Sequence, residues 1–119
     1  MKYALMIHSS DDHDRTLTPE ETAQLRAASM PRWVALFEHL GKLDPDVAGT
    51  ELDDARLAKT VRVRDGRTLV TDGPFVETKE QIGGVFITTL PDLDAAIDVA
   101  ARIPTSEHGT IEIRPLVER

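Results

Sequence analysis

The sequence predicts an α+β domain built around an antiparallel sheet, and three observations lead to this fold class. Two segments, near residues 18–41 and 92–104, carry the three- and four-residue apolar spacing of helices. Apolar runs with the character of strands precede and follow each of them. Between the helices, Asp65-Gly66 separates two alternating segments, the strongest short-range signal of a β-hairpin. The chain has 119 residues, so we expect a single domain over residues 1–119.

The first strand and helix have clear local signals. Residues 2–8 place apolar side chains on both faces, as in a central strand. Thr18-Pro19-Glu20-Glu21 then predicts a helix start, with Thr18 as N-cap, proline at the first helical position and Glu21 completing a capping box. Gly41 is typical of a helix end, and Pro31 predicts a kink or break near residues 28–31. The expected apolar stripe is Leu25, Ala28, Trp33, Leu36, Phe37 and Leu40.

The middle of the chain predicts a short strand and then a hairpin. The strand is expected around residues 47–52, and a polar connection leads from it to the hairpin at about residues 60–71. Arg64 and Arg67 flank the hairpin turn. These two side chains either point to water or together hold an anion.

The last third of the chain predicts strand, helix and strand. Residues 84–90 are apolar on both faces, as in an interior strand. Asp92 suits the N-cap of the second helix and Pro104 its end. Residues 110–114 alternate strictly, which predicts a strand with one wet face. The apolar stripe expected on the second helix is Leu93, Ala96, Ile97, Ala100 and Ile103.

Without the hairpin, the order of elements is βαββαβ, the ferredoxin-like plan in which two helices cover one face of an antiparallel sheet. The expected strands offer more apolar surface than two short helices can cover. We therefore predict a homodimer through the sheet faces. The residues behind this prediction are Tyr3, Leu5, Ile7, Phe86, Ile87 and Ile111.

Composition excludes several classes of function. The net charge of −7 argues against nucleic acid and anionic membranes as partners. The absence of cysteine excludes disulfides, thiolate catalysis and zinc–thiolate sites. No segment approaches the ~20 apolar residues of a membrane span. The apolar start is shorter than a signal peptide requires, so a cytoplasmic protein is expected.

Residues 71–84 form the segment with the densest candidate chemistry. Glycine before proline at 73–74 fixes a sharp, extended change of direction, and ionisable side chains surround it. Asp72 is the candidate general acid or base, although an aspartate here also suits the capping of a turn. Lys79 is a candidate countercharge for Asp72 or for an anionic ligand. The remaining candidate ligand-binding residues are Pro74, Phe75 and Glu77.

Other candidates have weaker patterns. His8 ends the first strand and is the second candidate catalytic residue, with a half-buried structural histidine as the alternative. Gly83 and Gly84 fit either a β-bulge or the close approach of a ligand. His8, Asp11, Asp12, His13 and Asp14 lack the spacing of a rigid ligand set, so no metal site is predicted. No glycine-rich phosphate cradle follows a strand, and no cofactor is predicted.

Thr71-Asp72-Gly73-Pro74-Phe75, followed by Glu77 to Gly84, resembles the signature of the DGPF branch of the YCII-related proteins. The resemblance extends over nearly the whole chain. It implies a ferredoxin-like dimeric α/β barrel. For YCII-like proteins it also implies an acid/base role for a His and an Asp in a cleft, with Asp72 as the carboxylate. The sequence departs from that pair, because His39 lies nearer the C-terminus of its helix than the pattern places the histidine.

Two functions follow as hypotheses. The first is a small dimeric enzyme that performs proton transfer on an unknown small molecule, with Asp72 as acid/base group and His8 or Lys79 assisting. The alternative is a non-catalytic module that binds a small ligand or a protein partner. The resemblance implies a link to stress signalling or sigma-factor regulation, since DGPF proteins often occur beside extracytoplasmic-function sigma factors. Heme chemistry is a third possibility and requires an axial histidine facing a large cavity.

Overall fold

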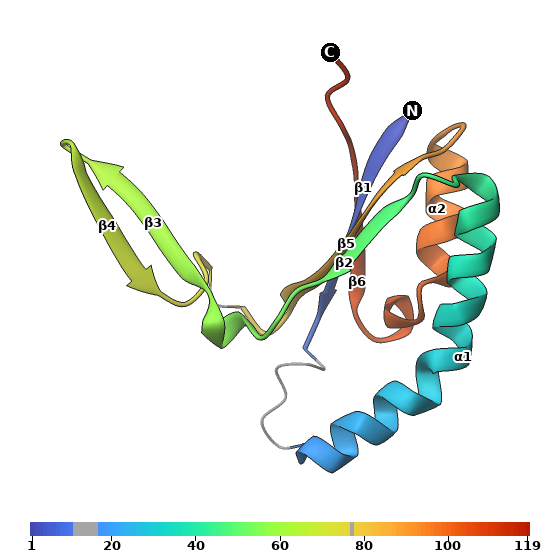
Figure 1. The fold of residues 1–119 in the computed structure, drawn as a ribbon, viewed down its shortest axis with the longest axis horizontal. Coiled ribbons are helices and arrows are strands. Elements are labelled where there is room, and N and C mark those ends of the chain that lie inside the picture. The colour runs from blue at the N-terminus through green and yellow to red at the C-terminus, as the bar shows by residue number, and fades with distance from the viewer. Residues whose placement is uncertain (11–16, 77) are drawn as a thin grey trace.

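The computed structural model describes residues 1–10, 17–76 and 78–119 (Figure 1). Its centre is a four-stranded antiparallel sheet with the strand order β2-β5-β1-β6, covered on one face by two helices. This mixed α+β architecture is compatible with the ferredoxin-like plan. No helix among the described residues is both long and apolar enough to cross a membrane. The sheet strands are β1 (Lys2–Ser9), β2 (Ala48–Glu51), β5 (Gln81–Thr89) and β6 (Thr110–Pro115).

Helix α1 (Pro19–Leu43) begins as its sequence predicts. The Thr18 side chain accepts from the backbone N–H of Glu21, and the Glu21 carboxylate accepts from that of Thr18, which completes the capping box. The helix continues through Pro31 without a break, and Figure 1 shows it changing direction in its middle part. The prediction that Gly41 ends the helix is wrong, since the helical hydrogen bonds run on to Leu43.

Helix α2 (Leu93–Arg102) is capped by Asp92, whose side chain accepts from the N–H of Ala95 at 2.9 Å. Both helices bury narrower stripes than their spacing predicts. In α1, Leu36 and Leu40 are buried while Leu25 and Phe37 are exposed. In α2, the buried residues are Ala96, Val99 and Ala100, whereas Leu93 and Ile97 are about half exposed.

The two faces of the sheet differ sharply. Tyr3, Leu5 and Ile7 of β1 join Phe86 of β5 in the core beneath the helices, with Ile111 of β6 packed against it. Side chains alternate along a strand, so the intervening residues lie on the other side of the sheet, which we call the open face. Of the six residues expected to form a sheet-face contact, only Ile87 lies on this open face. Strand register places these residues there: Ala4, Met6, His8, Val85, Ile87, Thr110, Glu112 and Arg114.

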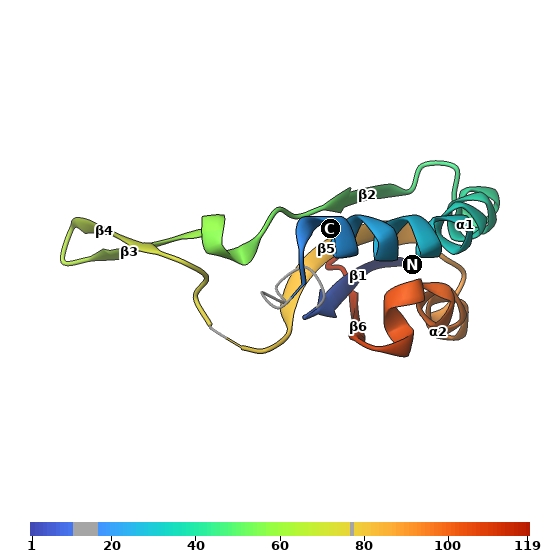
Figure 2. The same ribbon diagram turned by 90° about the horizontal axis from the view of Figure 1, so that it is seen from below.

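The predicted hairpin is confirmed and forms a separate two-stranded sheet from β3 (Lys59–Arg64) and β4 (Arg67–Asp72). Asp65 and Gly66 have φ values of 50° and 73°, as the primed turns of tight hairpins require. We call residues 59–72 the arm. Figures 1 and 2 show the arm projecting away from the sheet, toward the side opposite α2 and the C-terminal part of α1.

Candidate functional site

The loop that joins the arm to β5 divides into two halves with different surroundings. Its first half, from Asp72 to Phe75, closes the base of the arm. Its second half, from Thr78 to Gln81, leads into β5 and lies beside the end of β6. The densely charged segment of the sequence therefore contributes to two separate parts of the fold, the base of the arm and the neighbouring ends of β5 and β6.

Asp72 lies at the base of the arm, with 86% of its side chain exposed. The antiparallel register places it opposite Lys59, and the Lys59 ammonium donates to its Oδ1 at 2.5 Å. This hydrogen bond, together with the positive charge of Lys59, lowers the pKa of Asp72 below its ordinary value. Asp72 therefore stays a carboxylate throughout the neutral pH range. The countercharge is Lys59, where the sequence suggested Lys79.

The backbone around Gly73 pins the arm to the connection that precedes it. Gly73 donates its N–H to the carbonyl of Ala58 at 2.8 Å, and the Thr60 hydroxyl donates to the carbonyl of Gly73 at 2.8 Å. The φ of Gly73 is 94°, in the left-handed region that glycine adopts without strain. Next to it, Phe75 is 75% exposed, and the Arg62 guanidinium lies 5.2 Å from its ring centroid. The positive φ at position 73 therefore explains why this residue of the motif is glycine.

The second half of the loop is held by its own hydrogen bonds. The Gln81 side-chain amide donates to the carbonyls of Val76 and Thr78, and the Thr78 hydroxyl donates to the carbonyl of Glu80. The Glu80 carboxylate accepts from the Thr110 hydroxyl of β6 at 3.1 Å. Lys79 is exposed, and Glu77 lies outside the described residues. The binding roles predicted for Lys79 and Glu77 stay predictions.

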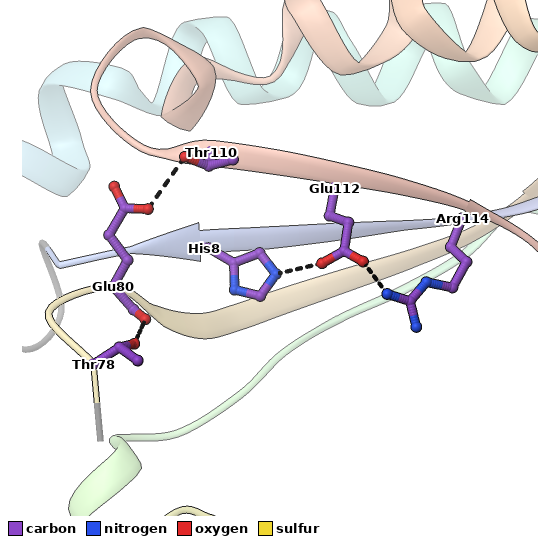
Figure 3. Close-up of polar contacts among 6 residues, drawn as sticks. All are labelled: His8, Thr78, Glu80, Thr110, Glu112 and Arg114. Carbon is purple, nitrogen blue, oxygen red and sulfur yellow. Dashed lines mark hydrogen bonds and ion pairs between the residues drawn. The ribbon is translucent and has the colours of Figure 1, made fainter. Parts of the chain in front are cut away.

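His8 lies on the open face in a short row of polar side chains (Figure 3). Its Nε2 atom is 3.5 Å from Oε1 of Glu112 on β6, within ion-pair range but longer than a well-formed hydrogen bond. The other oxygen of Glu112 accepts from Arg114. Figure 3 shows His8 turned toward Glu112, with Glu80 and Thr110 at the same end of the two strands. An imidazole beside a carboxylate is an arrangement that can support proton transfer.

Strand pairing explains why these side chains meet. On β6, Thr110 is opposite His8, and Glu112 follows two residues later on the same face. On the β5 side, the pairing shifts between Ile7, opposite Gly84, and His8, opposite Ile82. Gly83 is the extra residue, as the β-bulge interpretation of the glycine pair predicts. Such bulges re-aim neighbouring side chains at functional sites.

His39 does not belong to the open face. It lies on α1, with Nε2 3.8 Å from Oδ2 of Asp98 on α2, within ion-pair range, and the same oxygen accepts a hydrogen bond from Nε of Arg102 at 3.0 Å. It therefore links the two helices. The acidic run after His8, residues 11–14, lies outside the described residues. In the part of the chain that the structure describes, no three His, Cys, Asp or Glu side chains gather as a metal site would require.

A groove of about 440 Å³ lies at the other edge of the molecule, where α1 meets the end of β2. Its wall includes the ion pair between Arg26 and Glu51, whose charged atoms are 2.9 Å apart. None of the predicted site residues that the structure describes lines it. The lining residues are Thr22, Arg26, Glu51, Leu52, Asp53 and Asp54.

Of the two predicted catalytic residues, the structure places His8 next to a carboxylate and Asp72 next to a lysine. Within one chain, the two lie on different sheets and make no hydrogen bond or ion pair with each other. Sequence reasoning missed Glu112 and Arg114 as neighbours of His8. The available signal was the wet face of the strand at residues 110–114, but only the register of β1 against β6 aligns that face with His8.

Comparison with known proteins identifies the family to which the chain belongs. The model of the YCII-related domain matches residues 1–119. A protein of Rhizobium meliloti (strain 1021), described as "Uncharacterized protein R00369", is 33% identical over 118 residues, which is 98% of this chain and 92% of that protein. The chain belongs to the YCII-related family.

Proposed function

We propose that the protein binds a small molecule on the open face and acts on it by proton transfer, with His8 as the acid/base group. The observation that carries this proposal is the contact between His8 and Glu112 on the sheet face opposite α1 and α2. Glu112 lies within ion-pair distance of the imidazole, and Arg114 holds the second oxygen of Glu112. The Glu80 carboxylate, which accepts from the Thr110 hydroxyl, offers further acceptor positions at the same end of the strands.

Asp72 has a different part in this proposal. An acid/base role needs a pKa near neutrality, whereas the ion pair with Lys59 lowers the pKa of Asp72. We propose that Asp72 acts mainly by holding the base of the arm, and that its chemistry requires a partner that displaces Lys59.

A homodimer through the open faces is the second element of the proposal. Met6 and Val85 are opposite each other in the strand register and only partly buried, and Ile87 is 38% exposed. A second copy seated on this apolar strip would form the two-sheet core of a dimeric α/β barrel. His8 would then lie at the margin of a closed space. Exclusion of water there would strengthen its interaction with Glu112.

The open-face site predicts that His8→Gln weakens ligand binding on this face. The screen uses thermal shift with a set of small organic acids, enols and amides, followed by titration calorimetry of any compound that raises the melting temperature. We expect His8→Gln and Glu112→Gln each to weaken binding about tenfold or more, as loss of a charge-assisted contact does. His39→Gln is the matched control, since it removes a carboxylate-paired histidine from the helix side.

Asp72→Asn separates the two candidate acid/base groups. If His8→Gln binds and turns over the compound as the natural chain does, while Asp72→Asn does not, the role returns to Asp72. Equal loss in both variants would place both residues in one site. Retention of binding in both, with folding intact, would exclude the open-face site.

The alternative function is a non-catalytic module that binds a protein partner. The exposed apolar side chains of α1, among them Leu25, Met30, Val34 and Phe37, favour it. Chemical-shift changes confined to these residues on addition of a sigma-factor fragment would support this alternative.

A further inference from the structure

The arm is a well-defined hairpin that gains little packing from the rest of its own chain. Among the described residues, its two strands pair only with each other, and each residue of the arm is at least partly exposed. An isolated two-stranded hairpin is marginally stable in water, and a third strand or a packed surface is usually needed. The arm nevertheless has a tight primed turn at its tip and three ties at its base. A hairpin with a well-defined turn and base but no buried face indicates that another surface packs against it.

One face of the arm is apolar where a solvated ribbon would be polar. Val61 and Val70 are directly opposite each other, and Val63 follows on the same face. These three side chains are 59%, 62% and 60% exposed. Thr68 is opposite Val63, and the Lys59–Asp72 pair lies on the same face at the base of the arm. The other face carries Arg62 and Leu69, with Arg64 and Arg67 beside the turn. We call the three valines the valine face. Burying them would contribute free energy that the isolated chain does not gain.

The radius of gyration and the accessible surface indicate how much surface a partner could bury. The radius of gyration is 16.4 Å, against about 13.5 Å for a compact domain of this length. The accessible surface is 8423 Å², against roughly 6,400 Å² for a compact monomer of this mass. The excess of about 2,000 Å² per chain is in the range that each partner buries in a large, permanent dimer.

Charge identifies a second copy as the occupant. The arm holds four of the chain's 14 Lys and Arg residues and two of its 21 Asp and Glu residues, so its net charge is +2. The rest of the chain, from a total of −7, then carries −9. An arm that packs on the body of another copy joins opposite charges. Two arms packed on each other would instead join two segments of the same net charge.

The position of the arm fits the same partner. Figures 1 and 2 show it on the side of the four-stranded sheet away from α2, so the arm and the open face border one space. A second copy seated on the open face would lie next to the arm. We propose that each arm packs its valine face on the body of a second copy, so that the two chains exchange arms across a twofold axis. This inference rests on the proposed open-face dimer and adds a second contact to it.

The test compares dimer dissociation constants by sedimentation equilibrium over a dilution series. We expect Val61→Ser combined with Val70→Ser, which leaves the charge unchanged, to raise the dissociation constant about tenfold or more. Val117→Ser is the matched control, because this valine is exposed but outside the arm. The dissociation constant of the natural chain should also rise with salt, because the arm and the body carry opposite charge.

A third variant separates the arm from the open face. Val85→Asp places a charge on the open face and should also dissociate the dimer. If Val85→Asp dissociates it while the double valine variant keeps the natural dissociation constant, the arm proposal is overturned and the open-face dimer stands. A natural chain that is monomeric up to about 100 µM, far above the usual range of permanent dimers, overturns both.

A fluorescent probe gives a second readout that does not depend on how the valine variants fold. The chain has no cysteine, so Val70→Cys introduces a single labelling site on the valine face. An environment-sensitive dye at this position should shift its emission to the blue as concentration rises through the dissociation constant. The same dye on Leu57→Cys, exposed outside the arm, should not shift. Equal emission from position 70 in monomer and dimer would overturn the proposal.

Discussion

Asp44→Ala is expected to lower the free energy of unfolding by about 3 kcal/mol, because it leaves buried donors without an acceptor. Asp44 ends α1 and is only 8% exposed. Its Oδ2 accepts from the Thr88 hydroxyl at 3.0 Å and from the N–H of Thr89 at 2.9 Å. Its Oδ1 accepts from the N–H of Asp46 at 3.1 Å. One carboxylate thus ties the end of the helix to the end of β5.

Urea denaturation followed by circular dichroism measures this loss. Asp44→Asn should lose about half as much, because the amide keeps one acceptor oxygen but no charge. Asp46→Ala is the control, since its side chain is exposed and only its backbone takes part in the cap. A loss below about 0.5 kcal/mol for Asp44→Ala, typical of surface substitutions, would show that water replaces the carboxylate without cost.

The same residue predicts a pH dependence of stability. The hydrogen bond from the N–H of Thr89 is the main cause that lowers the pKa of Asp44 below its ordinary value of 3.8, with burial acting in the opposite direction. The folded state therefore binds the proton less tightly than the unfolded state. The stabilisation is fully present above the unfolded pKa and is lost as the pH falls through the folded pKa. The stability gap between the natural chain and Asp44→Asn should therefore be constant near neutrality and shrink below about pH 4.

Features set by neighbouring residues could be predicted from the sequence. The capping box at Thr18, the N-cap at Asp92 and the hairpin turn at Asp65-Gly66 each depend on residues within one turn, and all three are present. The end of α1 could not be predicted in this way. Gly41 is a local stop signal, but the helix ends where Asp44 reaches Thr89, which is distant in the sequence.

In the candidate site, too, the residues marked by local sequence could be predicted, whereas contacts that depend on strand pairing could not. His8 could be selected because it ends a strand, whereas its neighbour Glu112 follows only from the register of β1 against β6. The ion pair of Asp72 was within reach of the sequence. A two-residue turn at Asp65-Gly66 places Lys59 opposite Asp72, and counting outward from that turn would have replaced Lys79 as the countercharge.

Helix burial depends on where neighbouring elements end. The spacing in α2 makes Leu93 and Ile97 equivalent to Ala96 and Ala100 as parts of one stripe. The structure instead turns Val99, with Ala96 and Ala100, toward the sheet, and leaves Leu93 and Ile97 about half exposed. Periodicity alone identifies an apolar side of a helix but not the part of that side that a narrow sheet covers.

Gly109→Ala is expected to lower the free energy of unfolding by about 3 kcal/mol, at the upper end of the cost of overpacking. A Cβ at this position would lie 2.4 Å from the carbonyl oxygen of His8 and 2.9 Å from Cγ2 of Thr105. The first of these is a backbone atom of the central strand, which cannot rotate away. Gly109 also donates its N–H to the carbonyl of Thr105 at 2.7 Å, so the glycine itself is held in place.

The expected consequence is a displacement of His8 relative to β6, in addition to the loss of stability. The chemical shifts of the His8 imidazole should change in Gly109→Ala, and the variant should lose whatever ligand binding the open face has. Gly41→Ala is the matched control: an added Cβ there meets no atom within 4 Å, and the position is helical. It should raise stability by about 0.5–1 kcal/mol, as glycine-to-alanine changes in helices do. If both variants changed stability in the same direction, close packing against the His8 carbonyl would not be the reason that residue 109 is glycine.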